Sequence, residues 1–416
     1  MIKDSTEDGH YNEFLASSCD NSLASYRPQI LITYVNYNGL ENFWTYHDHS
    51  IGRAGTAYVN DYNGNLVLTK DMAQTYGNRM PAVLTHVYNS NDKDTDIGYG
   101  YGFRLNYHQT VKPVTISGTA YYAYEDEDGT THYFYKDENQ KWIDETGIQL
   151  TLTIGSGTED MYTITDKNDQ KLVFGSDGYL RKIVDANSNT LTVSWNGGKI
   201  VKITDGAGRA LSLVYTSGQL TSITGPDGTV TLDYGGGMLS LVTDVDGKKF
   251  DYVYDERRLL VTATNIDGYQ VWFDYTAQAP YRVVGVSETD GSRPGQSYQV
   301  SYGDNIHQFI DHKGRKELYM FNDSGHTVCI KNEEGYAQSY KYLTSGKNKN
   351  RLSHVSKLQY TGIQKLKNPN VTSLADWRYY VSTSGITPSL NQSAANARVG
   401  TSSLQLTSSS ASGRGE

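Results

Sequence analysis

A short motif that recurs about every 20 residues is the feature that most constrains the fold of this chain. One copy reads ITDGAGRALSLVY and spans residues 203–215. It consists of a β-branched residue, an acidic or amide residue two positions later, a turn, and alternating residues that end in an aromatic one. The turn glycines lie 19 to 23 residues apart, at Gly208, Gly228, Gly247, Gly268, Gly291, Gly314 and Gly335. Such a period is typical of repeat proteins, in which each unit is one supersecondary element.

Other copies keep the same order of residue types with local departures. They read IVDANSNTLTVSW at 183–195, ITGPDGTVTLDY at 223–234, VTDVDGKKFDYVY at 242–254 and ATNIDGYQVWFDY at 263–275. In the second of these, Gly225 stands where the acidic residue would be. More divergent copies begin at Val286, Ile310 and Ile330, and the same pattern occurs upstream at 164–174 and around Gly129.

Each unit has the chemistry of a β-hairpin. An Asp or Asn side chain begins a turn by bonding the backbone two residues on, and the following glycine supplies the positive φ that a tight turn requires. The residues after the turn alternate, as in LSLVY at 211–215, which predicts a strand with one buried and one solvated face. Because a single hairpin is marginally stable, we expect successive hairpins to pair in one long, curled antiparallel sheet.

The composition supports an all-β fold. The chain has 35 Tyr but only 9 Phe among its 416 residues. A tyrosine ring can pack while its hydroxyl reaches water or a backbone group. We therefore hypothesise a sheet that faces a water-filled interior on one side and solvent on the other.

Charge and hydropathy narrow the classes of partner. The net charge of −9 is spread along the chain, which argues against a nucleic-acid partner, because phosphate binding needs clustered Lys and Arg. No run of about 18 apolar residues occurs, so no membrane span is expected. The two cysteines, Cys19 and Cys329, cannot form a disulfide framework.

The repeats resemble those of the RHS or YD-repeat proteins, a family of bacterial wall-associated and teneurin-like shell proteins. The resemblance covers residues 121–342 and includes the stretch DVDGKKFDYVYDERRLLVTATNIDG. That stretch contains the paired Tyr254 and Asp255, followed by Arg257, Arg258 and Leu259. Residues 52–111 resemble the segment that leads into the repeats in this family, with LTHVYNS and GYGFRLNY as typical strands.

The flanks resemble two further kinds of β module. ASYRPQILITYV at 24–35 looks like the last strand of a β-sandwich, and residues 375–409 look like the first strands of a carbohydrate-binding-type jelly roll. We therefore read the chain as a fragment with truncated β-sandwich pieces at both ends. The expected domains are the end of a sandwich at 1–36, a lead-in at 37–115, RHS/YD repeats at 116–343, a linker at 344–370 and a truncated jelly roll at 371–416.

The resemblance implies a structural function. In this family the repeats build a β-spiral shell that encloses or carries a toxin. The chain is thus expected to be a structural segment of a secreted or cell-surface shell, extracellular or in the cell wall, with a toxin domain of the same full-length chain as partner. The alternative is a carbohydrate-binding or cell-wall-binding module without toxin delivery.

Histidines and cysteines form two candidate groups. His47 and His49 would share one face of a strand and could offer two metal ligands. Since no second ligand pair follows at a recognisable spacing, we interpret them as part of an exposed linker. His326 and Cys329 are three residues apart, which places them on opposite faces of a strand and argues against a shared catalytic role.

Acidic residues form two more groups. The alternating Asp92, Asp94 and Asp96 are similar to a calcium loop, but Ile97 and Phe103 stand where that loop needs Gly and Glu. The segment YEDEDGT groups four acids before a glycine: Glu125, Asp126, Glu127 and Asp128. Both groups are interpreted as solvated turns.

No catalytic, cofactor-binding or metal site is predicted, and no enzyme activity or cofactor is expected. The Asp and Gly of the repeats recur as turns require, and neither a Ser/His/Asp elbow nor a phosphate or dinucleotide fingerprint is present. Three aromatic residues could stack on a sugar, although strand packing explains them equally well; they are Trp377, Tyr379 and Tyr380.

Overall fold

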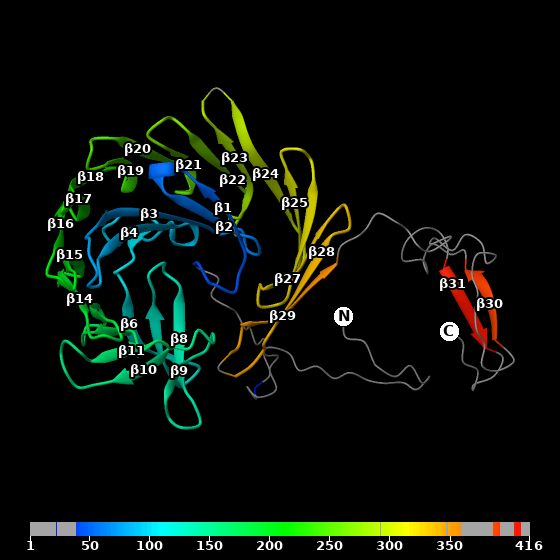
Figure 1. The fold of residues 1–416 in the computed structure, drawn as a ribbon, viewed down its shortest axis with the longest axis horizontal. Helices are drawn as coiled ribbons and strands as arrows, with labels where there is room; N and C mark the ends of the chain where they lie inside the picture. Colours follow the sequence, from blue (N-terminus) through cyan, green and yellow to red (C-terminus); the bar gives the residue numbers. More distant parts are fainter. Residues whose placement is uncertain are drawn as a thin grey trace. The chain divides into compact units, whose positions relative to one another are not determined.

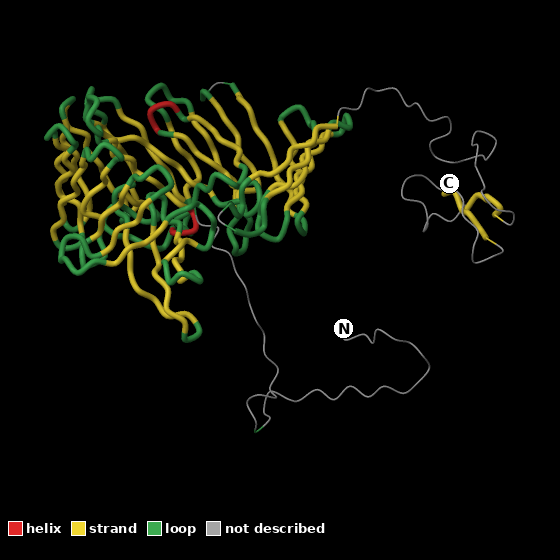
Figure 2. The backbone as a smooth tube through the Cα atoms, turned by 60° about the horizontal axis from the view of Figure 1, so that its bottom comes forward, coloured by secondary structure: helices red, strands yellow, loops and turns green. Residues whose placement is uncertain are grey.

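The computed structural model describes residues 39–291, 293–346 and 348–358, together with Ser22 and the strands β30 (Ile386–Asn391) and β31 (Ser403–Ser408). The chain divides into two compact units. Among the described residues, the larger unit contains 39–329 and 340–354, with the first sheet and the strands β6 to β26. In the smaller unit, β30 and β31 pair antiparallel. The fold is all-β, and helix is confined to short turns (Figure 2).

The first sheet is formed by the stretch that precedes the repeats. Its five strands pair antiparallel in chain order: β1 (Tyr46–Ser50), β2 (Thr56–Asn60), β3 (Leu66–Gln74), β4 (Val83–Asn89) and β5 (Phe103–Leu105). Two single-turn 3-10 helices lie in its loops, η2 (Gly52–Ala54) and η3 (Ser90–Asp92). Among the described residues, no helix has the length and apolar character needed to cross a lipid bilayer.

The second sheet is formed by the hairpins. From β6 to β26, each strand pairs antiparallel with the next along the chain. The bounds are β6 Thr110–Ile116, β7 Thr119–Glu125, β8 Thr131–Lys136, β9 Trp142–Asp144, β10 Thr151–Ile154, β11 Tyr162–Thr165, β12 Lys171–Phe174, β13 Leu180–Val184, β14 Thr190–Asn196, β15 Lys199–Thr204, β16 Ala210–Thr216, β17 Gln219–Gly225, β18 Gly228–Gly235, β19 Met238–Thr243, β20 Lys249–Tyr254, β21 Leu260–Thr264, β22 Gln270–Tyr275, β23 Val283–Thr289, β24 Pro294–Tyr302, β25 Ile306–Asp311 and β26 Lys316–Phe321. The chain continues with β27 Thr327–Asn332, β28 Ala337–Tyr342 and β29 Leu352–Leu358. The sequence prediction of one long antiparallel sheet is confirmed.

The turn chemistry of the repeats is confirmed. Asp205 Oδ1 accepts hydrogen bonds from the backbone N–H of Ala207 and of Arg209, both at 2.9 Å. Its backbone N–H in turn donates to the Arg209 carbonyl, at 2.8 Å. Gly208 has a φ of 86°, which an L side chain rarely adopts. The same pattern of Oδ1 contacts, to the residues two and four positions on, recurs at Asp166, Asp185, Asp255 and Asp311.

The closing aromatic residue lies at a bend of the sheet in successive units, and in several units it also bonds the unit before. The register shifts beside this residue in successive pairs, for example between Val214 and Tyr215. Such bulges increase local twist and bend a sheet. Four of these side chains donate to a carbonyl 15 residues earlier: Trp195 to Leu180, Tyr215 to Ile200, Tyr275 to Leu260 and Tyr342 to Thr327. The hydroxyls of Tyr215, Tyr275 and Tyr342 thus bond the backbone of the preceding unit, a contact that Phe could not make.

The five-stranded sheet lies inside the curve of the larger sheet (Figure 1). Alternate residues of the repeat strands are buried, such as Leu211 and Leu213 of β16. The inner sheet contributes its own fully buried side chains, among them Leu68, Leu84 and Tyr88. The concave face that we expected to meet a water-filled interior is, over this section, covered by the lead-in segment.

Many hydrogen bonds join the lead-in segment to repeats spread over much of the larger sheet. Five of them are Leu220 N–H to Gly98 O (2.9 Å), Tyr101 N–H to Gly237 O (3.1 Å), Tyr252 Oη to Ala54 O (2.6 Å), Val283 N–H to Gly64 O (2.9 Å) and His307 Nδ1 to Asp61 O (2.8 Å). The inner sheet therefore acts as an internal brace that holds successive hairpins at a fixed curvature.

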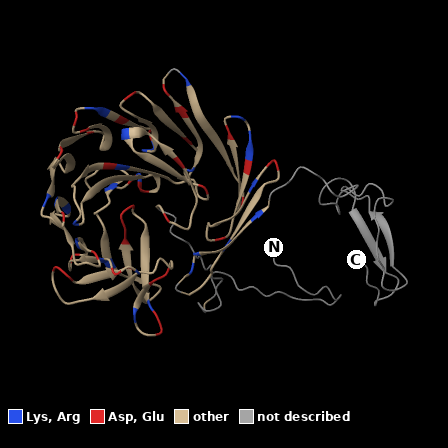
Figure 3. Ribbon diagram, in the orientation of Figure 1, with Lys and Arg blue, Asp and Glu red and all other residues tan. Residues whose placement is uncertain are grey.

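Acidic and basic residues are interspersed along the described strands and turns (Figure 3).

Candidate functional site

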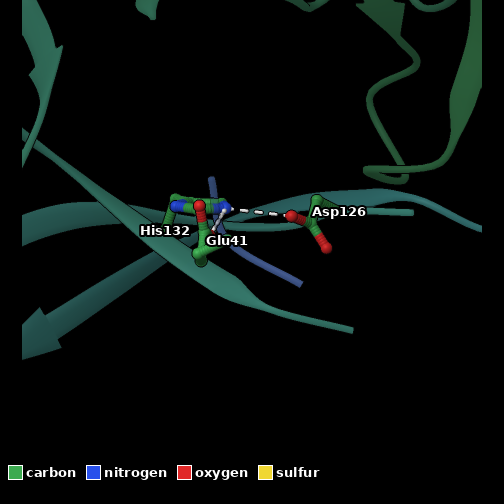
Figure 4. Close-up of side chains that lie close together, drawn as sticks. All are labelled: Glu41, Asp126 and His132. Atoms are coloured by element: carbon green, nitrogen blue, oxygen red, sulfur yellow. Dashed lines mark hydrogen bonds and ion pairs between the residues drawn. The ribbon is translucent and has the colours of Figure 1, made fainter. Parts of the chain in front are cut away.

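A buried cluster of two carboxylates and an imidazole lies where the lead-in segment meets the first hairpin of the larger sheet (Figure 4). His132, on β8, is 1% exposed. Its Nε2 lies 3.0 Å from Asp126 Oδ2 and 3.3 Å from Glu41 Oε1. The three donor atoms all lie within 4.8 Å of one another.

The β7–β8 turn places Asp126 by the same chemistry as in the repeats. Asp126 Oδ1 accepts hydrogen bonds from the backbone N–H of Asp128 (3.1 Å) and of Thr130 (3.0 Å). The other carboxylate oxygen, Oδ2, is left to face His132. One oxygen thus makes the turn and the second is available to the cluster.

Asp128 brings the third member to the site. Its Oδ2 accepts the backbone N–H of Leu40 at 2.7 Å, and its Oδ1 accepts the Thr130 hydroxyl at 2.7 Å. Gly39 packs so closely that a Cβ at this position would overlap the Asp128 carboxylate. The neighbouring Glu41 is thereby held against the hairpin, with its carboxylate turned toward His132 (Figure 4).

The far side of the imidazole is also occupied. His132 Nδ1 lies 3.4 Å from Thr146 Oγ1. The Thr146 hydroxyl donates to Asp144 Oδ1 at 3.1 Å, and Asp144 is 7% exposed. Both ring nitrogens of His132 therefore face polar groups, which fixes the orientation of the ring.

Burial and the neighbouring charges shift the protonation of this cluster. Burial raises the pKa of Glu41 to about 7 and raises that of Asp128 well above its ordinary range. Burial alone would lower the pKa of His132, but the hydrogen bond and charge of Asp126 outweigh it and raise that pKa to about 9. Burial would likewise raise the pKa of Asp126, but the contact with His132 outweighs it and lowers that pKa. At neutral pH the cluster therefore contains an imidazolium beside an ionised Asp126.

The interpretation of YEDEDGT as a solvated turn is wrong for part of the segment. Asp128 is 6% exposed and Asp126 is largely buried, because residues 39–41 cover the turn. Glu125 pairs with Arg104 at 2.6 Å, and only Glu127 is exposed. Sequence reasoning missed Glu41 and His132, since no motif links residues that lie 91 positions apart in the sequence.

The interpretation of His47 and His49 as part of an exposed linker is also wrong. Both lie on β1 and share a face, as the spacing predicted. His47 Nδ1 contacts Asp61 Oδ1 at 2.5 Å, and His49 Nδ1 contacts Glu288 Oε1 at 2.8 Å. Because the larger sheet covers this face, each histidine meets its own carboxylate and the two do not converge on one ligand site.

In the other acidic group, Asp94 and Asp96 lie at the surface, as expected, whereas Asp92 is half-buried. Asp94 is exposed and pairs with Lys93 and Arg258. Asp96 is exposed, and its Oδ1 accepts the backbone N–H of Gly98 at 2.8 Å. These acids therefore act as turn and bridging residues between the lead-in segment and the repeats.

His326 and Cys329 lie in different surroundings. His326 is buried just before β27 and stacks on Tyr342, while Cys329 on β27 is half-buried. Four residues singled out in the sequence lie outside the described residues: Cys19, Trp377, Tyr379 and Tyr380.

Comparisons with known proteins give distant structural likenesses. No family model and no curated protein matches this chain. A TcdB2-TccC3 crystal structure resembles it with a TM-score of 0.31 and 10% identity over 78% of this chain and 20% of that chain. A Tc holotoxin pore from Photorhabdus luminescens gives 0.29 and 11% over 71% and 19%, and a porin-like protein from Bacteroides uniformis gives 0.19 and 11% over 62% and 92%.

The chain spans about a fifth of the length of the toxin-complex chains that it resembles. A likeness at these TM-scores carries no argument about activity or partners. The function proposed below therefore depends on the residues and contacts of this chain.

Proposed function

We propose that this chain is a structural section of a shell of the RHS/YD-repeat type, in a secreted or cell-surface protein that delivers a toxin. The observation that carries the proposal is the internal brace. Hydrogen bonds from residues 54–101 reach strands from β17 to β25. Such an arrangement fixes the curvature of a wall along many repeats.

The repeat itself supports a structural function. The turn carboxylates, such as those of Asp205 and Asp255, accept hydrogen bonds from backbone N–H groups of the same turn. The closing Tyr215 donates a hydrogen bond to a backbone carbonyl of the preceding unit. Side chains that hold neighbouring units together in this way build a continuous sheet whose stability comes from interfaces between units.

The test is protection of an enclosed segment in the full-length protein that contains this chain. We expect a hollow particle by electron microscopy, with a C-terminal segment that resists added protease until the shell is unfolded. A full-length variant without residues 39–109 should lose this protection, because the repeats then lack their brace. A solid or extended particle, or a C-terminal segment that is cleaved at the rate of a free peptide, would refute the shell.

Binding of the purified chain to a glycan array, without any enclosed segment in the full-length protein, would instead support a carbohydrate-binding module. The two experiments are independent. A negative array leaves the shell proposal standing, while an unprotected C-terminal segment in the unaltered full-length protein overturns it whatever the array shows.

A further inference from the structure

We propose that Glu41, Asp126 and His132 bind a divalent transition-metal ion of the Zn²⁺ class, which fastens residues 39–46 to the β7–β8 hairpin. The role is structural, since the site joins two segments that are 85 residues apart (Asp126 and Glu41). It lies outside the repeat chemistry on which the shell proposal depends.

The two donor-atom distances at His132 Nε2 fit a zinc ion. Ligands about 2.0 Å from a tetrahedral zinc lie roughly 3.3 Å from one another. In the structure, His132 Nε2 lies 3.0 Å from Asp126 Oδ2 and 3.3 Å from Glu41 Oε1. One imidazole nitrogen and two carboxylate oxygens are ligands that zinc accepts, and water would complete the coordination.

Glu41 is the observation that a hydrogen-bonded pair alone does not explain. Its side chain is nine-tenths buried. The single Nε2 hydrogen of His132 is directed to Asp126, the nearer acceptor. Within the described part of the chain, no hydrogen bond is donated to the Glu41 carboxylate, although it points at Nε2 (Figure 4). Burying an ionised carboxylate without a donor is costly, and a bound cation would stabilise this ionised form in place of a proton.

The charge around the imidazole also favours a cation. Asp128 and Asp144 are buried in the same region, in addition to the two carboxylate ligands. Each is already engaged, Asp128 by Leu40 and Asp144 by Thr146. A divalent ion bound to a neutral imidazole supplies one positive charge more than the imidazolium does, beside the carboxylates of Glu41 and Asp126.

The second ring nitrogen has the partner that metal-binding histidines usually have. Thr146 Oγ1 lies beside Nδ1, and the Thr146 hydroxyl is itself bonded to Asp144. When a metal ion replaces the Nε2 hydrogen, the remaining Nδ1–H donates to this hydroxyl and the Nε2 lone pair faces the ion between the two carboxylates. An imidazole ligand selects zinc-like ions over Ca²⁺, which takes six to eight oxygens.

The test uses the 416-residue chain after removal of metal with a chelator. Titration with Zn²⁺ by calorimetry should give one site per chain that is absent with Ca²⁺. Glu41→Gln and Asp126→Asn should each abolish the site. Thr146→Val, which leaves all three ligands in place, should weaken it by about tenfold. The matched control is Glu288→Gln, which alters a separate His–carboxylate contact, at His49, and should leave the site unchanged.

Two outcomes overturn the proposal. One is the absence of a saturable Zn²⁺ site in the unaltered chain, which would mean that the three groups only share a proton. The other is a site that survives both Glu41→Gln and Asp126→Asn. If one ligand variant fails to fold, Thr146→Val still decides the question, because this substitution would not change the affinity for an ion bound elsewhere.

Discussion

Replacing Tyr88 by Phe tests the internal brace at a single atom. Tyr88, on β4 of the inner sheet, is fully buried. Its hydroxyl accepts the backbone N–H of Leu260 at 3.0 Å and donates to the carbonyl of Arg258 at 3.2 Å. The substitution keeps the ring and removes both hydrogen bonds across the two sheets.

The expected magnitude follows from what the hydroxyl leaves behind. An unpaired buried donor or acceptor costs about 1–3 kcal/mol. The Leu260 N–H loses its partner entirely, and the Arg258 carbonyl loses a longer bond. We therefore expect Tyr88→Phe to reduce the free energy of unfolding by about 3 kcal/mol, near the sum of one full and one weaker loss.

Tyr254→Phe is the matched control. The Tyr254 ring lies 6.1 Å from that of Tyr88, between ring centroids. Its hydroxyl is buried without a hydrogen-bond partner within the described residues. Removing this hydroxyl leaves no group unpaired, so the variant should be neutral or slightly more stable.

The assay is urea unfolding of both variants together with hydrogen exchange of the Leu260 amide. A loss of about 3 kcal/mol corresponds to roughly a hundredfold faster exchange if exchange occurs by the same opening. Equal effects of the two substitutions, or a change below about 0.5 kcal/mol in Tyr88→Phe, would refute the brace as a source of stability.

Three further predictions concern turns and protonation. Asp205→Ala removes two turn hydrogen bonds and the Arg209 Nε contact to Asp205 Oδ2, and should lower the free energy of unfolding by about 2–3 kcal/mol without loss of the fold. Urea unfolding of the variant checks this, and complete unfolding would contradict a repeat in which each turn acts locally. Gly208→Ala, at a positive φ in open space, should cost about 1 kcal/mol, and Gly178→Ala should cost more by thermal unfolding, since its Cβ would also overlap the carbonyl of Val111. Burial lowers the pKa of His86 from 6.5 to about 3, so below pH 6.5 the unfolded chain binds a proton that the native chain does not bind. The stability that neutral His86 contributes is therefore complete above pH 6.5 and is lost as the pH falls toward 3. Between pH 7 and pH 5 the loss should be about 2 kcal/mol, measured by urea unfolding at both pH values, and His86→Gln should show a smaller dependence on pH.

Much of the larger sheet could be predicted from the sequence because its determinants are local. The turn at Asp205 depends on contacts to residues two and four positions on. Leu211 and Leu213 alternate with the exposed Ser212 and Val214, so the period of two indicates that the leucines share the buried face. Recurrence of these short-range rules about every 20 residues is sufficient to predict a series of antiparallel hairpins.

The candidate site could not be predicted in the same way. Asp126 was visible as a turn residue, and only the chain segment that covers the turn makes it a buried carboxylate. Glu41 belongs to no motif, and His132 resembles any strand residue after a turn. Glu41 lies beside His132 because the Leu40 N–H donates a hydrogen bond to Asp128, which is 88 positions away in the sequence.

The sequence by itself thus determined the repeating unit, its turns and the alternation of its faces, since these follow from interactions within a few residues. Only the tertiary structure decided what covers the concave face. The lead-in strands fill it because their own apolar residues, such as Leu68 and Tyr88, need a second sheet to be buried. That packing also converts His47 and His49 from an apparent ligand pair into two separate carboxylate contacts, because burial by a distant strand leaves no periodic mark in the sequence.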